Sequence, residues 1–289
     1  MSPADLRLDP RYVRRTLRDA GLRARHGLGQ NFLADVDVLE GILREADPVP
    51  GDRVLEIGPG LGFLTGGLLA AGAAVTAVEL DRGMAAFLRD TFATEVEEAR
   101  LRLIEGDALD QDLVGLVPPP YDVVANLPYH ITSPVLHRLL GRAPRADRLV
   151  LMLQREVAER VSAAPGEMSY LSVFVQYHAK ARIAFRVPRE AFEPAPKVES
   201  AVLVLEPYPA DDRLDAATED HLWRVVQAGF RERRKMLHNV LTRQLPIEPD
   251  RVDAALEAVG IARDRRPQTV AVGEWIALAE ALGPIPEAG

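Results

Sequence analysis

Short apolar runs alternate with longer amphipathic stretches between about residues 51 and 207. Runs of this length are typical of buried strands. They are V-L-E-I (54–57), A-V-T-A-V-E (74–79), L-R-L-I (101–104), D-V-V-A (122–125) and L-V-L-M-L (149–153). Helix-like segments such as M-A-A-F-L-R-D-T-F separate the earlier runs. Buried strands that alternate with helices predict a Rossmann-like, doubly wound α/β fold with a mostly parallel sheet.

Two later apolar runs, R-I-A-F-R-V (182–187) and S-A-V-L-V-L-E (200–206), have no clear helix between them. We expect them to form an antiparallel hairpin at one edge of the sheet. The intervening R-E-A-F-E-P-A-P-K contains two prolines, so it predicts a long ordered loop and not a tight turn.

The periodicity changes at E-P-Y-P-A-D-D (206–212), and no strand signal follows it. Helices are expected around 218–230, 232–244, 249–259 and 273–282. We therefore predict a catalytic α/β domain over residues 1–207 and a small all-helical domain over residues 208–289.

The composition is that of an ordinary soluble globular protein, with 47% hydrophobic and 27% charged residues in a chain of 289. No apolar run approaches the ~18 residues of a membrane helix, and the charged first thirty residues show no secretory signal. We expect a cytoplasmic protein with no membrane partner and, because no exposed apolar seam is evident, a monomer. The chain has no cysteine, and its six histidines show no paired ligand spacing, so no metal site is expected.

Positive charge is concentrated in two segments, although the net charge is −8. Residues 1–33 contain seven arginines and three aspartates, a balance of +4. Residues 224–243 carry a balance of +5, from Arg224, Arg231, Arg233, Arg234, Lys235 and Arg243 against Glu232. Basic segments on an acidic protein are suited to a polyanion such as RNA, although a solvated arginine-rich helix would give the same pattern.

A glycine-rich turn follows the first expected strand. Gly58 and Gly60 would let the backbone approach a ligand closely. The dinucleotide fingerprint requires a third glycine at position 63, where this chain has Phe63. Glu79 ends the second expected strand and could accept both hydroxyls of a ribose, while Asp107 follows the third and could accept an adenine amino group. These elements predict an adenosine-binding crevice that suits S-adenosylmethionine better than NAD or ATP, although either acid alone could cap a helix.

The fourth expected strand runs into N-L-P-Y-H-I-T-S-P (126–134). Asn126 and Pro128 could simply form a turn, with Ser133 capping and Pro134 opening the next helix. Alternatively, the Asn126 oxygen and a backbone carbonyl beside Pro128 could accept the N–H groups of a planar exocyclic amine, making its lone pair available for methylation. Tyr129 could stack on the flipped base. Because the fourth strand should lie beside the first, Asn126 should face the glycine loop, which favours the chemical interpretation.

The sequence strongly resembles the ribosomal small-subunit (16S) RNA adenine N6,N6-dimethyltransferases, over nearly the whole chain. The shared motifs include G-Q-N-F-L (29–33), V-L-E-I-G-P-G-L-G-F-L-T (54–65), N-L-P-Y (126–129), F-E-P-A-P-K-V-E-S-A-V (192–202) and F-R-E-R-R-K-M-L-H-N-V-L (230–241). The first and fourth of these are close to diagnostic.

The resemblance implies dimethylation of two adjacent adenines near the 3′ end of the small-subunit RNA, during subunit assembly. It implies that Asn31 and Leu33 contact S-adenosylmethionine. The remaining cofactor contacts would be Gly58, Glu79, Asp107 and Asn126. Asn126, Pro128 and Tyr129 match the base-holding motif, and Phe192 matches an aromatic residue that packs near the target base. Arg231, Arg233, Arg234 and Lys235 would contact RNA phosphates from a helix of the tail domain.

Two departures from the family pattern concern substrate fit: His130 stands where Asn is common, and M-S-Y-L-S-V (168–173) lacks the usual Tyr-Gly. Two alternatives remain. One is the related large-subunit RNA adenine methyltransferase of antibiotic resistance, which the tail motif disfavours. The other is an RNA-binding ribosome-assembly factor without catalysis, which the intact motifs disfavour.

Overall fold

The computed structural model describes residues 8–209 and 213–286. The chain divides into two compact units, one within Met1–Ala158 and Lys180–Pro207 and the other within Glu159–Ala179 and Tyr208–Gly289. We call the first the catalytic unit, after the prediction from the sequence, and the second the helical unit. Pro207 is a boundary both here and in the sequence-based division. Residues 159–179, which we expected in the first unit, belong to the second because Met168, Val173 and Tyr177 pack into its core.

The catalytic unit contains a seven-stranded sheet in the order β4-β3-β2-β5-β6-β9-β7. Its strands are β2 (Arg53–Ile57), β3 (Ala74–Glu79), β4 (Leu101–Glu105), β5 (Asp122–Asn126), β6 (Arg148–Gln154), β7 (Ala179–Val187) and β9 (Ser200–Pro207). The first five are parallel, and β9 is antiparallel to β6. The predicted α/β class and the five predicted strands are confirmed. The two late runs are neighbours at one edge of the sheet, with β7 outermost.

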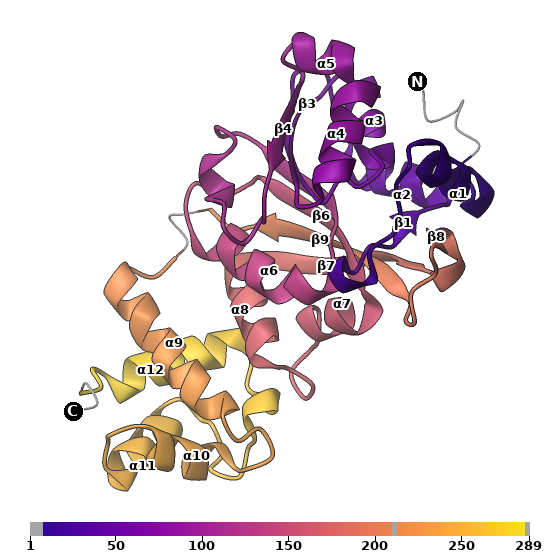
Figure 1. The fold of residues 1–289 in the computed structure, drawn as a ribbon. Helices are drawn as coiled ribbons and strands as arrows, with labels where there is room; N and C mark the ends of the chain where they lie inside the picture. Colours follow the sequence, from indigo (N-terminus) through magenta and orange to yellow (C-terminus); the bar gives the residue numbers. More distant parts are fainter. Residues whose placement is uncertain (1–7, 210–212, 287–289) are drawn as a thin grey trace. The chain divides into compact units, whose positions relative to one another are not determined.

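Helices connect the parallel strands and cover the sheet (Figure 1). The connecting helices are α3 (Phe63–Ala70), α4 (Arg82–Thr91), α5 (Ala93–Glu97) and α6 (Thr132–Gly141), whereas α2 (Val36–Ala46) precedes β2 and α7 (Arg155–Val161) follows β6. Local capping sets several of the starts. Asp35 and Asp81 each accept two backbone amides of the first turn, at α2 and α4 respectively. The apolar face of α2 is buried through Leu39 and Ile42.

The N-terminal segment forms α1 (Pro10–Asp19), the 3₁₀ turn η2 (His26–Leu28) and β1 (Phe32–Leu33). Asp9 caps α1, and Pro10 occupies its first turn. The long loop between β7 and β9 is ordered, as predicted, and contains η5 (Arg189–Ala191) and β8 (Phe192–Glu193). β1 and β8 pair antiparallel in a separate two-stranded sheet.

The helical unit contains α8 (Tyr170–His178), α9 (Ala216–Phe230), α10 (Leu237–Gln244), α11 (Pro249–Ala258) and α12 (Val272–Leu282), with the 3₁₀ turn η7 (Pro267–Thr269). The helix predicted over 232–244 begins only at Leu237, so the prediction that Arg231, Arg233, Arg234 and Lys235 lie on a helix was wrong. They form an exposed turn, because residues 231–236 offer no buried apolar position before Leu237 and most helical stability in proteins comes from packing.

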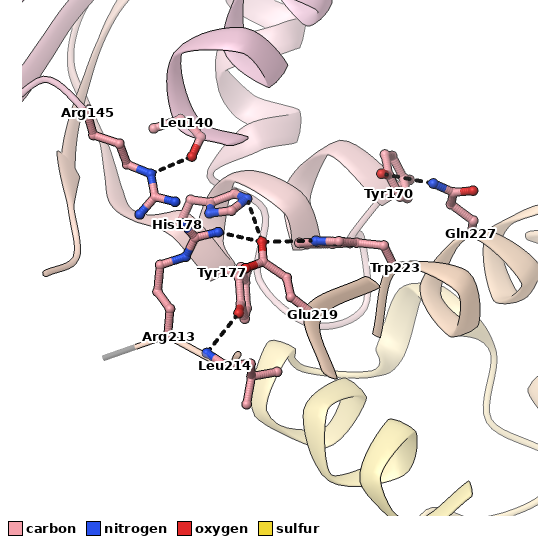
Figure 2. Close-up of polar contacts among 10 residues, drawn as sticks. All are labelled: Leu140, Arg145, Tyr170, Tyr177, His178, Arg213, Leu214, Glu219, Trp223 and Gln227. Carbon is pink, nitrogen blue, oxygen red and sulfur yellow. Dashed lines mark hydrogen bonds and ion pairs between the residues drawn. The ribbon is translucent and has the colours of Figure 1, made fainter. Parts of the chain in front are cut away.

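A polar cluster inside the helical unit joins α8 to α9 around Glu219 (Figure 2). The Glu219 carboxylate accepts from the Arg213 guanidinium and from Trp223 Nε1 at 3.3 Å, and His178 Nε2 lies 3.9 Å away. His178 is fully buried among the rings of Phe174, Tyr177 and Trp223. The cluster thus holds the first turns of α9 against α8. Across the described residues, no helix has the length and apolar character needed to cross a membrane.

Candidate functional site

One cavity of the catalytic unit lies at the carboxyl ends of β2, β3, β4 and β5. Its volume, open mouth included, is about 1100 Å³, which suits a cofactor-sized ligand. Among the residues that line it are Asn31, Leu33, Gly58, Gly60, Glu79, Asp107, Asn126, Pro128 and Tyr129. Adjacent parallel strands end at the same edge of a sheet, so predicted site residues from distant parts of the sequence meet there.

The glycine loop between β2 and α3 depends on positive φ angles. Gly58, Gly60 and Gly62 have φ of 72°, 57° and 77°, a region that favours glycine. A Cβ atom on Gly58 would lie 3.5 Å from Pro128 Cδ, so the loop and the N-L-P-Y turn are in close contact. A Cβ atom on Gly62 would lie 2.6 Å from side-chain atoms of Leu88 and Phe92. Gly62 thus permits the close packing that a glycine at position 63 provides in dinucleotide-binding loops.

Glu79 is buried at the end of β3, and its carboxylate is held by two backbone amides. Gly60 N donates to Oε2 at 3.0 Å and Asp81 N donates to Oε1 at 2.8 Å. Burial raises the pKa of Glu79, and these amide hydrogen bonds oppose the rise. A carboxylate has about four acceptor positions, so Glu79 can still accept the two hydroxyls of a ribose.

Glu56, in β2, also lines the cavity and was not among the predicted site residues. Its side chain is 1% exposed and accepts a hydrogen bond from Thr65 Oγ1 at 2.7 Å. Burial raises its pKa to about 8, and Glu79 adds to the rise. The sequence does contain a signal, since an acidic residue interrupts the otherwise apolar run V-L-E-I.

Asp107 lies in the turn after β4 and lines the cavity. Leu109 N donates to Asp107 Oδ1 at 2.8 Å, a local hydrogen bond that fixes the direction of the carboxylate. The residue therefore stabilises its own turn and also presents a carboxylate to the cavity.

Asn126 is the last residue of β5, and the 3₁₀ turn η4 (Tyr129–Ile131) follows Pro128. Asn126 Nδ2 donates to the Asn31 carbonyl at 3.3 Å, which leaves Oδ1 as the acceptor for a ligand amine. Pro128 O accepts the Ile131 amide at 3.1 Å. Of the carbonyls beside Pro128, that of Leu127 is therefore the better candidate for a second acceptor.

The G-Q-N-F-L segment forms part of the cavity wall next to Asn126. Asn31 Nδ2 donates to the Gly29 carbonyl at 3.1 Å, and Leu33 in β1 pairs with Phe192 in β8. Phe192 is 2% exposed and is not among the described residues that line the cavity. Its place beside the target base therefore stays a prediction.

The basic residues Arg231, Arg233, Arg234 and Lys235 are exposed in the helical unit, immediately before α10. Arg231 Nη1 donates to Gln244 Oε1 at 2.8 Å. Within 8–209 and 213–286, no acidic side chain forms an ion pair with Arg233, Arg234 or Lys235.

His130 lines the cavity in the catalytic unit. This departure from the family pattern therefore lies at the site itself.

Comparisons with known proteins show the family of the chain. Residues 21–283 match the family Ribosomal RNA adenine dimethylase. The chain is 44% identical over 276 residues to the Ribosomal RNA small subunit methyltransferase A of Anaeromyxobacter sp. (strain K), covering 91% of this chain and 94% of that protein. Identity is 42% over 268 residues to the protein of the same name from Thermosynechococcus vestitus, covering 90% and 97%.

Two solved structures are similar over most of the chain. The dimethyladenosine transferase from Plasmodium falciparum has a TM-score of 0.72 at 26% identity, covering 86% of this chain and 95% of that one. The 23S rRNA methyltransferase ErmE has a TM-score of 0.69 at 29% identity, covering 88% and 100%. Both are class I methyltransferases, in agreement with the Rossmann-like class I methyltransferase fold that the sequence predicts for the catalytic unit. With a family match across nearly its whole length, the chain belongs to the ribosomal RNA adenine dimethylase family.

Proposed function

We propose that this protein transfers methyl groups from S-adenosylmethionine to N6 of two adjacent adenines near the 3′ end of small-subunit (16S) ribosomal RNA, as a monomer in the cytoplasm. The observation that carries the proposal is the single cavity that brings together the glycine loop, Glu79, Asp107 and the Asn126–Tyr129 turn. Relatives at 41–45% identity are named as small-subunit enzymes, whereas the large-subunit enzyme is a structural neighbour at 29%.

The donor set of the cavity fits S-adenosylmethionine. Glu79 would accept the ribose hydroxyls, and Asp107 would accept the adenine amino group. Gly58 and Gly60 would allow the backbone to approach closely, while Asn31 and Leu33 would close the cavity from the N-terminal side. The cofactor, when bound, supplies an electrophilic methyl group on a sulfonium.

The Asn126–Tyr129 turn would hold the target adenine. The N6 amine of adenine is a weak nucleophile because its lone pair is delocalised into the ring. Asn126 Oδ1 and the Leu127 carbonyl would accept its two N–H groups and favour a more pyramidal nitrogen, and Pro128 would keep these acceptors fixed. Stacking on Tyr129 contributes about 1–3 kcal/mol, which offsets part of the cost of flipping the base out of its stack.

The exposed turn Arg231–Lys235 would bind the RNA backbone. It carries four cationic side chains and leads directly into the N-terminus of α10, where backbone amides also favour anions. Phosphate contacts position a protein on RNA without reading its bases, and each one adds to the salt dependence of binding.

The decisive experiment incubates the protein and an Asn126→Ala variant with S-adenosylmethionine and under-methylated small ribosomal subunits. The RNA is then digested, and the modified nucleosides are identified by mass. We expect N6,N6-dimethyladenosine at the two adjacent adenines with the unaltered protein, and a rate lower by about 10²–10³ in the variant. Methylation of free large-subunit RNA alone would support the resistance-type enzyme. Binding to small subunits without any methylation would support an assembly factor.

Cofactor choice is tested separately by calorimetry with S-adenosylmethionine and with NAD. Asp107→Asn should weaken S-adenosylmethionine binding by about tenfold or more, since hydrogen bonds to charged groups contribute about 1.5–3 kcal/mol. Asp110→Asn is the matched control, because Asp110 lies on the same turn, is exposed and does not line the cavity. Equal effects of the two substitutions, or tighter binding of NAD, would contradict the assignment.

A further inference from the structure

A hydrogen bond joins the N-L-P-Y turn to the first residue of β9. Tyr129 Oη and Ser200 Oγ are 2.8 Å apart, although 71 positions separate the two residues in the sequence. Either hydroxyl can be the donor. Ser200 is fully buried, and it belongs to the motif F-E-P-A-P-K-V-E-S-A-V, whose serine has no role in the function proposed above.

The position of Ser200 is tightly fixed. It is the residue of β9 that pairs with Gln154 at the end of β6. One residue earlier, the Glu199 carbonyl accepts the Arg155 amide at 3.0 Å, and the Glu199 carboxylate forms an ion pair with Arg155. The start of β9 is thus tied to the end of β6 and to the first residue of α7, so the serine hydroxyl is a rigid point of attachment.

Tyr129, by contrast, sits in a short 3₁₀ turn at the edge of the cavity. Its backbone is constrained by Pro128, but its ring can still turn about two side-chain torsions. A hydrogen bond at Oη holds the far end of the ring, so it restrains the first torsion and the direction of the ring axis, which runs through Oη. A ring held in this way stays at one place at the edge of the cavity.

We propose that Ser200 is a positioning residue that holds the Tyr129 ring in place for the target base. This inference rests on the proposed function, in which Tyr129 stacks on a flipped adenine. Ser200 itself is not among the described residues that line the cavity, so it acts through Tyr129 and not on the substrate. A displacement of about an ångström in a reacting group changes rates by up to about 10²-fold. A hydroxyl that contacts Tyr129 but not the substrate can therefore have a measurable effect on the rate.

The test is a double-substitution cycle with Ser200→Ala, Tyr129→Phe and the two combined. Methyl transfer to small-subunit RNA is measured for each, with kcat and KM separated. If the hydroxyl pair is the unit that acts, each single change lowers kcat/KM by about the same factor, on the order of tenfold, and the double variant is no slower than either single one. Independent, multiplying effects would overturn the proposal, as would an unchanged rate for Ser200→Ala beside a slower Tyr129→Phe.

A second measurement follows the ring directly, without RNA or cofactor. In protein labelled with ¹³C in the tyrosine rings, Ser200→Ala should shift the signal of the hydroxyl-bearing carbon of Tyr129 and increase the mobility of its ring axis. Ser172→Ala is the matched control, since Ser172 is also fully buried and donates to the Arg160 carbonyl at 2.5 Å within the helical unit. It should leave the Tyr129 signals unchanged.

The two measurements separate failure of the inference from failure of the proposed function. If the unaltered protein methylates no RNA, the proposed function fails, while the ring signals still decide whether Ser200 fixes Tyr129. If the protein methylates RNA but Ser200→Ala alters neither the ring signals nor the rate, the inference alone fails.

Discussion

Replacing Glu56 by Gln should remove a pH dependence from the stability of the catalytic unit. The Glu56 carboxyl is buried in β2 and accepts a hydrogen bond from Thr65. Burial raises its pKa from 4.5 to about 8, the Thr65 bond opposes the rise, and the nearby Glu79 adds to it. Glutamine has the same shape, keeps an oxygen to accept from Thr65, and is neutral at every pH.

The sign of the effect follows from the direction of the shift. Between its ordinary pKa of 4.5 and its folded-state pKa of about 8, Glu56 keeps its proton in the folded chain and loses it in the unfolded chain. The stabilisation is therefore complete below the lower value and is lost as the pH rises through the higher one. Each pH unit in the window removes roughly 1 kcal/mol, so the whole window is on the order of 4 kcal/mol. Glu56→Gln lacks this slope. Between pH 5.5 and pH 8.5, the difference in unfolding free energy between the two proteins should therefore shift by a few kcal/mol in favour of the variant.

The assay must report on the catalytic unit alone. Both tryptophans, Trp223 and Trp275, belong to the helical unit, so tryptophan fluorescence would follow the wrong transition. Because the chain has no cysteine, a single Ala77→Cys substitution in the buried centre of β3 gives a reporter. The fraction labelled by a short thiol-reagent pulse in increasing urea is calibrated at each pH against fully unfolded protein.

Glu97→Gln is the matched control, since Glu97 is exposed on α5 and the substitution removes the same charge. Its stability curve should run parallel to that of the unaltered chain. If the curve of Glu56→Gln also runs parallel between pH 5 and pH 9, Glu56 is ionised in the folded protein, and the electrostatic account of this cavity is wrong.

Three further outcomes are expected. Gly62→Ala should destabilise the catalytic unit by about 2–4 kcal/mol in the same thiol assay, because its φ is 77° and the new methyl group would lie 2.6 Å from Leu88; an unchanged stability would show that the loop relaxes easily. Glu219→Gln should lower the free energy of unfolding of the helical unit by about 1–3 kcal/mol, measured as a lower urea midpoint of tryptophan fluorescence, because it weakens the ion pair with the part-buried Arg213; no shift would mean that solvent replaces the pair. Arg234→Gln should weaken RNA binding regardless of sequence and reduce the salt slope by about one; an unaltered slope in binding titrations at several salt concentrations would exclude a phosphate contact.

The strands and the acids at their carboxyl ends could be predicted because both signals are local. An apolar run followed by an acid, as at Glu79 and Asp107, requires no knowledge of distant residues. The rule that parallel strands end at the same edge then places these acids together, and the cavity contains both of them. The family resemblance supplied residues that no spacing identifies, among them Asn31 and Leu33, which also line the cavity.

Other features could not be predicted from neighbouring residues in the sequence, because they depend on burial in the folded protein. The arginine-rich turn before α10 carries residues with good helix propensity, yet it has nothing to pack against until Leu237 and does not continue the helix. The acid at position 56 is visible in the sequence, but its raised pKa results from the burial of the Glu56 side chain. In both cases propensity and residue type were known, and the tertiary environment decided the outcome.

The residues that orient Asn126 and Tyr129 lie far from the N-L-P-Y turn in the sequence. The Asn126 amide is held by the Asn31 carbonyl, 95 positions away, and the Tyr129 hydroxyl by Ser200, 71 positions away. An isolated N-L-P-Y sequence is therefore only a turn, because nothing within it determines which way the amide or the ring points. Those two contacts lie in the motifs G-Q-N-F-L and F-E-P-A-P-K-V-E-S-A-V, which flank the turn on both sides along the chain. The three motifs form one unit in which the outer two fix the geometry of the middle one, and a substitution of Ser200 should therefore act through Tyr129.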